Sequence, residues 1–149
     1  MLKAGKDYVG VTTAFILTDG AGKILLVKRS NKCRDEHGTW DSGAGQLEVG
    51  FTLEENVRKE VREEYGSECE IMERLPFFDM IIQDGDFINH WIHFCFVVSV
   101  NPTKVKNNEP EKIEEMRWVY LWDLPSPLHS ATEKALNIWR TKAWIKFSD

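Results

Sequence analysis

The chain has 149 residues, of which 42% are hydrophobic and 29% are charged, a composition typical of a globular protein. This length suits one domain with a sizeable core, and we expect residues 1–149 to form a single domain. The net charge of −5 argues against a nucleic-acid polymer or an anionic membrane as the main partner, because both require a basic surface.

The cysteines and the apolar segments bear on the compartment. Cys33, Cys69 and Cys95 form no CxxC pair, which favours a reducing compartment over a disulfide framework. The first ten residues lack the apolar segment of a secretory signal, and the longest apolar run, residues 94–98, is far too short to span a bilayer. We therefore expect a cytoplasmic protein.

Two strands and a long loop are predicted first. Residues 8–17 alternate on one face as a strand does, residues 18–23 carry an Asp-Gly turn signal, and residues 24–29 form the returning strand. The polar stretch 30–46 is predicted to be a long loop. Long ordered loops are usually functional, so this segment is a candidate part of a site.

A helix is predicted next, over residues 52–65. Thr52 is a good N-cap residue, Glu55 completes a capping-box pattern three residues later, and Gly66 is a natural residue to end the helix. The Gly-rich segment 43–50 runs directly into this helix, and glycine permits a close approach of the backbone to a ligand.

The remaining elements complete the predicted fold. The predicted strands lie at 69–75, 76–83, 87–100 and 115–122, and a packing helix is expected over 129–147. This order of elements indicates an α/β domain with a mixed or antiparallel sheet between helices.

Three glutamates of the 52–65 helix, Glu60, Glu63 and Glu64, fall within about 100° of each other on a helical wheel. The apolar stripe of the same helix consists of Leu53, Val57, Val61 and Tyr65. Crowded carboxylates have raised pKa values unless nearby cations compensate their charge, and Lys59 can compensate it only in part. A divalent cation such as Mg²⁺ is the natural remaining partner. A solvated acidic face is the alternative, since such faces are common.

Residues 45–67 resemble the signature of the Nudix (MutT-like) hydrolase family. That signature is Gly, five residues, Glu, seven residues, Arg-Glu, an aliphatic residue, any residue, Glu-Glu, any residue, Gly and an aliphatic residue. The matching positions are Gly45, Glu60, Val61, Glu63, Glu64 and Gly66. Three positions depart from it: Phe51 stands in place of Glu, Lys59 in place of Arg, and Ser67 in place of an aliphatic residue.

The resemblance implies an α/β/α sandwich with a mixed central sheet, and Mg²⁺ as the cofactor, with Mn²⁺ as a substitute. The metal ligands that it implies are Glu60, Glu63, Glu64 and Gly45. It also implies that Glu63 by preference, or Glu60, acts as general base, and that Lys59 steadies the carboxylates or touches phosphate.

The substrate implied by the resemblance is a small nucleotide, a nucleoside diphosphate linked to another group. Segment 108–125 resembles small nucleoside triphosphate diphosphatases, which favours a triphosphate giving the monophosphate and pyrophosphate. Arg29 is a candidate for contact with phosphate, and Trp91 is a candidate for stacking on a base. The acidic loop offers Glu109 and Glu114 as further candidates. A homodimer stays open.

Other functions also stay open. The departures at Phe51 and Lys59 leave room for a nucleotide-binding module of the same fold that has lost turnover. Residues 25–38 partly resemble coenzyme A pyrophosphatases, and residues 38–45 loosely resemble isopentenyl-diphosphate isomerases, so either activity is an alternative.

Overall fold

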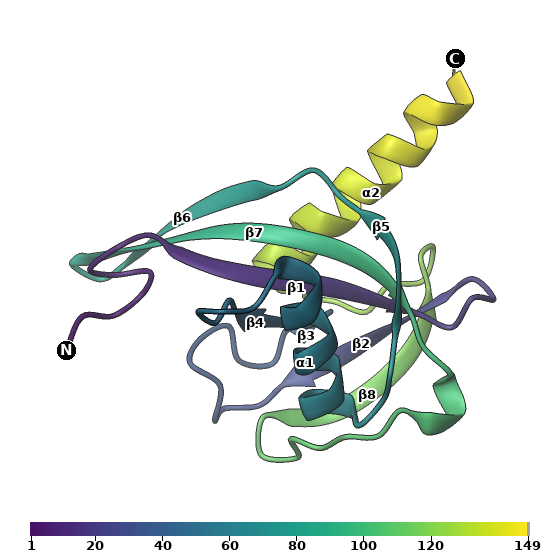
Figure 1. The fold of residues 1–149 in the computed structure, drawn as a ribbon, viewed down its shortest axis with the longest axis horizontal. Helices are drawn as coiled ribbons and strands as arrows, with labels where there is room; N and C mark the ends of the chain where they lie inside the picture. Colours follow the sequence, from purple (N-terminus) through teal and green to yellow (C-terminus); the bar gives the residue numbers. More distant parts are fainter. Residues whose placement is uncertain (149) are drawn as a thin grey trace.

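The computed structural model describes the backbone of residues 1–148 and their side chains except those of residue 84 and residues 143–148. In this part of the chain, eight strands form one sheet, and two α-helices lie against it (Figure 1). In chain order the elements are β1 (Gly10–Thr18), β2 (Lys23–Arg29), β3 (Trp40–Asp41), β4 (Ala44–Gln46), α1 (Leu53–Tyr65), β5 (Glu70–Arg74), β6 (Phe78–Asp84), β7 (Phe87–Ser99), the short 3₁₀ helix η1 (Pro102–Lys104), β8 (Ile113–Tyr120) and α2 (Ser130–Ser148).

The sheet is mixed, as the resemblance implies. Its main path runs β3-β2-β1-β7-β5, with β4 paired to β1, β6 to β7 and β8 to β2. The β1–β7 pair is parallel, and the other pairs are antiparallel. β1 pairs with β2 only at Thr18 and Ile24. Nearer its N-terminal end, at residues 12–14, the antiparallel partner of β1 is β4. The two halves of the sheet therefore diverge, and the candidate site lies where they separate.

Side chains of β1 alternate between two cores, one on each face of the sheet. Phe15 and Leu17 belong to the core under α1, whereas Ala14 and Ile16 belong to the core under α2. The side chains of α1 that are fully excluded from solvent are those of Asn56, Val57, Val61 and Tyr65. Because each helix covers one face of the sheet, the fold is the α/β/α sandwich predicted from the sequence.

The predicted helix over 52–65 is confirmed at both ends. The Thr52 side chain accepts a hydrogen bond from the Glu55 backbone N–H, the Glu55 side chain closes the capping box, and Gly66 adopts a left-handed φ of 65°. The prediction of an uninterrupted loop over 30–46 is wrong in part, because β3 and β4 lie within it. Strands of two and three residues are too short to show a periodic pattern.

Candidate active site

A cavity of about 440 Å³ opens where the two halves of the sheet diverge. Its walls come from β1, α1, β7, the loop after β2 and the first turn of α2. The predicted site residues that line it are Arg29, Glu60, Glu64, Trp91 and Glu109. The structure therefore brings together residues that are up to 80 positions apart in the sequence.

Glu64 is the most unusual group in this cavity. Its side chain is partly buried, and its Oε2 atom is excluded from solvent and has no hydrogen-bond partner. Burial, followed by the nearby charges of Glu109 and Glu60, raises the pKa of the Glu64 carboxyl well above its ordinary value. Burying an unpaired carboxylate oxygen costs free energy, so the site is suited to a cation that would bind this oxygen.

Glu60 lies beside Glu64 on the same face of α1 and is held by Lys59. The Lys59 Nζ lies 2.8 Å from Glu60 Oε1 and 3.7 Å from Glu63 Oε2. Burial disfavours the charged form of Lys59, but hydrogen bonds to Glu60 and Glu48 outweigh it and raise the pKa of the ammonium. Burial raises the pKa of the Glu60 carboxyl despite the opposing effect of Lys59. Lys59 thus contacts two of the three glutamates of this helix face, and its predicted role in steadying them stays a prediction.

Gly45 leaves the space that the Glu60 side chain occupies. A Cβ atom on Gly45 would lie 2.1 Å from Glu60 Cδ, so only glycine leaves room for this carboxylate. The Gly45 carbonyl, predicted as a metal ligand, already accepts hydrogen bonds from Thr12 Oγ1 at 2.9 Å and from Asn56 Nδ2 at 3.4 Å. The structure therefore supplies a packing reason for a glycine at this position.

Two predicted carboxylates, Glu63 and Glu114, lie outside the cavity lining. The Glu63 side chain is 58% exposed, although it shares Lys59 with Glu60. Glu114 lies on β8, where its carboxylate is 4.0 Å from Lys28 Nζ. Of the candidate glutamates in the acidic loop, Glu109 is the one that lines the cavity.

Arg29 lines the cavity, but its guanidinium is engaged by carboxylates. Nη1 donates to Asp41 Oδ2 at 3.0 Å, and Nη2 donates to Asp35 Oδ1 at 2.9 Å. Burial would raise the pKa of the Asp41 carboxyl, but the charges of His129 and Arg29 outweigh it and lower the value. Arg29 therefore braces the wall of the site and has fewer donors left for a phosphate group than the sequence suggested.

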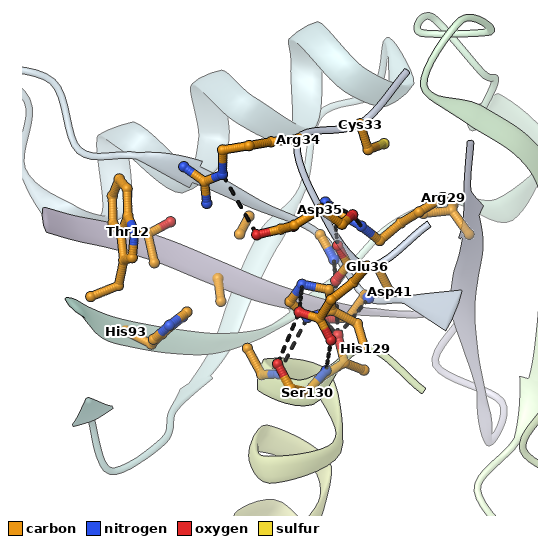
Figure 2. Close-up of a pocket in the computed structure, with 18 of the residues that line it drawn as sticks. Thr12, Arg29, Cys33, Arg34, Asp35, Glu36, Asp41, His93, His129 and Ser130 are labelled. Carbon is orange, nitrogen blue, oxygen red and sulfur yellow. Dashed lines mark hydrogen bonds and ion pairs between the residues drawn. The ribbon is translucent and has the colours of Figure 1, made fainter. Parts of the chain in front are cut away.

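A second carboxylate cluster joins the loop after β2 to α2 (Figure 2). Asp35, Glu36 and His129 are the described residues whose potential ligand atoms all lie within 4.8 Å of one another. Glu36 accepts hydrogen bonds from Ser130 N and Oγ, each at 2.9 Å, and its Oε2 lies 2.8 Å from His129 Nε2. Both oxygens of the Glu36 carboxylate therefore have protein partners, and they tie the loop to the start of α2.

One end of the cavity is aromatic and is lined by Trp91 and His93 of β7. Trp91 packs over Gly10, where a Cβ atom would lie 2.5 Å from the indole, and the Arg34 guanidinium lies 5.4 Å from the ring centroid. His93 stacks on Phe78 with ring centroids 5.0 Å apart, and burial lowers its pKa to about 4. His93 is therefore neutral near pH 7, and its Nδ1 atom has no hydrogen-bond partner.

Sequence reasoning missed several residues that shape the site. Asp41, Glu36 and His129 meet only through the fold, and nothing in their local sequence indicated it. Asn56 carried a signal, because asparagine is a poor residue for a helix interior. It is fully buried and donates to Thr13 Oγ1 at 2.8 Å, which ties α1 to β1.

Comparison with known proteins identifies the family. The family model described as "NUDIX domain" matches residues 9–139, which is most of the chain. The chain belongs to the NUDIX domain family.

Both relatives and solved structures support this Nudix assignment. The chain is 28% identical to the Escherichia coli protein named nucleoside triphosphatase NudI, over 86% of this chain and 94% of that protein. It is 27% identical to the mouse protein named 8-oxo-dGDP phosphatase NUDT18, over 84% of this chain. It resembles the crystal structure of a MutT Nudix hydrolase from Burkholderia pseudomallei with a TM-score of 0.76 and 29% identity, covering 87% of this chain and 96% of that one.

The Nudix relatives differ in length. The chain spans 36% of the mouse NUDT18 protein and 31% of a Nudix hydrolase from Caenorhabditis elegans. It thus covers about a third of the length of these two curated relatives, and the similarity to them concerns the Nudix domain.

Proposed function

We propose that this protein hydrolyses a diphosphate bond of a nucleoside triphosphate and releases the monophosphate and pyrophosphate, with Mg²⁺ as cofactor and Mn²⁺ as a substitute. The observation that carries the proposal is the buried, unpaired Oε2 atom of Glu64 in a cavity that Glu60 and Glu109 also line. Oxygen ligands of this kind suit a hard divalent cation, and Mg²⁺ is usually held by a few carboxylates together with substrate phosphates.

In this proposal Glu60 and Glu64 hold the metal, with Glu63 and Glu109 as additional ligands. When bound, Mg²⁺ would neutralise charge on the phosphate oxygens and lower the pKa of a bound water molecule. The Gly45 carbonyl is a weaker candidate ligand, because it already accepts hydrogen bonds from three side chains, those of Thr12, Thr13 and Asn56.

A carboxylate of the chain accepts the proton of the attacking water. The water oxygen bonds to phosphorus, the bond to the leaving pyrophosphate oxygen breaks, and the proton of the water passes to a carboxylate. Glu60 and Glu63 are the candidate bases. Glu60 lines the cavity and is held by Lys59 at 2.8 Å, whereas Glu63 is 58% exposed, so Glu60 is better placed than the sequence suggested.

The choice of a nucleotide rests on the aromatic end of the cavity. Trp91 lines the cavity, and the Arg34 guanidinium lies over its ring as a cation whose ion pair with Asp35 is long, at 3.6 Å. Aromatic faces stack on nucleobases, and a guanidinium can bind phosphate. The name of the E. coli relative, nucleoside triphosphatase, supports the choice of a triphosphate.

The activity test is a phosphate- and pyrophosphate-release assay, with and without Mg²⁺, over a panel of substrates. The panel holds nucleoside triphosphates, 8-oxo-dGDP, ADP-ribose, coenzyme A and isopentenyl diphosphate. Metal-dependent release of pyrophosphate from a triphosphate is the expected result. Nucleotide binding without turnover would identify an impaired binding module instead. Turnover of coenzyme A, or isomerisation of isopentenyl diphosphate, would support the corresponding alternative.

Trp91→Leu tests the role of the aromatic end. We expect the KM for a nucleoside triphosphate to rise about 10-fold, because stacking on a base contributes about 1–3 kcal/mol. Hydrolysis of inorganic tripolyphosphate, which has no base, should change less than about twofold on the same argument. Trp122→Leu is the matched control, since Trp122 is 80% exposed and lies outside the cavity lining. An equal loss on both substrates would contradict base stacking at Trp91.

The proposal includes a cytoplasmic location and a small-molecule partner. Among the residues that the structure describes, no helix is long and apolar enough to cross a bilayer. The negative net charge of −5 disfavours a nucleic-acid polymer as substrate. A homodimer stays open, and the molar mass in solution, measured by light scattering, decides it.

A further inference from the structure

Position 51 is one of the three positions at which this chain departs from the family signature. The signature has a glutamate there, and the structure shows the Phe51 ring with its centroid 5.8 Å from Lys59 Nζ. An aromatic face attracts a cation, but it provides no carboxylate that could accept a hydrogen bond and fix the direction of the ammonium. If Lys59 depended on position 51 alone, it would be poorly oriented.

A carboxylate reaches Lys59 from another position in the same loop. Glu48 Oε1 accepts a hydrogen bond from Lys59 Nζ at 3.0 Å, and Glu60 Oε1 accepts one at 2.8 Å. The Lys59 side chain is only 14% exposed, although the Glu48 carboxylate is 55% exposed. Lys59 is therefore held between two carboxylates, one from the loop and one from the metal-binding face.

The backbone fixes Glu48 in this place. The Glu48 N–H donates to Asn56 Oδ1 at 3.3 Å, and the Glu48 carbonyl accepts from the Phe51 N–H at 3.2 Å. Asn56 is fully buried in α1, four residues from Glu60. Because Glu48 is anchored to the helix that carries Lys59 and Glu60, the contact is built into the fold rather than being a chance meeting of two surface side chains.

We propose that Glu48 is a positioning residue that acts through Lys59 on Glu60 and replaces the carboxylate that position 51 lacks. Lysine is a flexible point charge, unlike the planar guanidinium of arginine, so it needs a second anchor to hold one direction. Without Glu48, the ammonium is free to turn toward Glu63 or solvent, and Glu60 loses its fixed orientation toward the cavity. The inference rests on the proposed function only in that Glu60 is taken as a metal ligand.

The first test is Mg²⁺ binding by the Glu48→Gln variant, measured by calorimetry and by the rise of Tm with Mg²⁺. We expect affinity to fall about 10-fold, as is typical when a group that orients a metal ligand is lost. The Tm without metal should stay within about 2 °C of the parent, because the ion pair that is lost is partly exposed. The matched control is Glu68→Gln. It removes a surface ion pair in which the Glu68 carboxylate lies 3.5 Å from the guanidinium of Arg62, a residue of α1.

The second test is rescue by the signature residue. In the Glu48→Gln background, Phe51→Glu should restore most of the lost Mg²⁺ affinity, and with an active substrate it should restore kcat while the nucleotide KM stays constant. A structural role for Glu48 predicts no such rescue. If Glu48→Gln binds Mg²⁺ like Glu68→Gln, or if the double variant folds but recovers nothing, the proposal is overturned. Because calorimetry needs no turnover, this outcome is separate from a failure of the proposed activity.

Discussion

Glu64→Gln is expected to lower the metal-dependent kcat/KM by about 100-fold, which corresponds to about 2.7 kcal/mol of transition-state stabilisation. The reason is that Glu64 offers a buried oxygen with no protein partner beside Glu60 in the cavity. The amide keeps the shape of the side chain but cannot provide a charged ligand. The rise of Tm with Mg²⁺, expected for the parent, should be largely lost in the variant.

In the presence of a chelator, the Glu64→Gln variant should gain stability at high pH, in contrast to its loss of metal-dependent activity. The pKa of Glu64 is raised in the folded protein, so above about pH 4.3 the folded state holds a proton that the unfolded chain releases. The free energy of unfolding of the parent should therefore fall as pH rises through this window. Glu64→Gln has no carboxyl group at this position, so its free energy of unfolding should not fall in this way. The variant should be more stable than the parent at pH 8 and differ little from it near pH 4.

Chemical denaturation at both pH values measures the difference, and Glu68→Gln serves as the control, since the Glu68 carboxylate is 80% exposed. If Glu64→Gln is instead less stable than the parent at pH 8, Glu64 has a stabilising partner in the metal-free protein. That result would remove the observation on which the proposed metal site depends.

The sequence predicted the parts of the site that are encoded locally. The α1 helix carries its own start and stop at Thr52 and Gly66, and its three glutamates share a face because helical spacing is fixed. The metal-binding face could therefore be proposed without a structure. Which glutamate enters the cavity depends on how the helix is rotated against the sheet, and this separates the partly buried Glu64 from the exposed Glu63.

The rest of the site depends on contacts between distant segments. Arg29 was predicted as a phosphate ligand because arginine often has that role, but Asp35 of the following loop and Asp41 of β3 occupy it. The pair with Asp41 depends on the docking of β3 beside β2, and β3 has just two residues. A segment this short carries no periodic signal, so neither the strand nor the partners of Arg29 could be predicted.

Phe51 illustrates how a departure from a motif can mislead. Its presence raised the question of whether the acidic face is fully functional, since a helper carboxylate is missing at that position. The structure shows another carboxylate, Glu48, at 3.0 Å from Lys59, three residues earlier in the chain. A motif specifies sequence positions, whereas the proposed metal-binding face needs a charge at a place in space, and a loop can supply that charge from a different position.

Gly45→Ala is expected to lower kcat/KM by about 100-fold while the protein still folds. The new Cβ atom would lie 2.1 Å from Glu60 Cδ and 2.5 Å from its Oε1, so one of the two groups must move. Glu60 is the far end of a flexible side chain and Gly45 is backbone in β4, so the carboxylate should move rather than the strand. A displacement of about 1 Å at a reacting centre can cost about 100-fold in rate.

Gly20→Ala is the control for this substitution. Gly20 has a φ of 77° and open space around it, so alanine there strains a turn remote from the cavity. We expect that variant to lose about 1 kcal/mol of stability and to keep its activity. Gly45→Ala should show the reverse, with a near-normal free energy of unfolding, weakened Mg²⁺ binding by calorimetry and a large loss of rate. If Gly45→Ala folds and retains full Mg²⁺ affinity and rate, then the position of Glu60 beside β4 is not required, and Glu60 is not the metal ligand that the site needs.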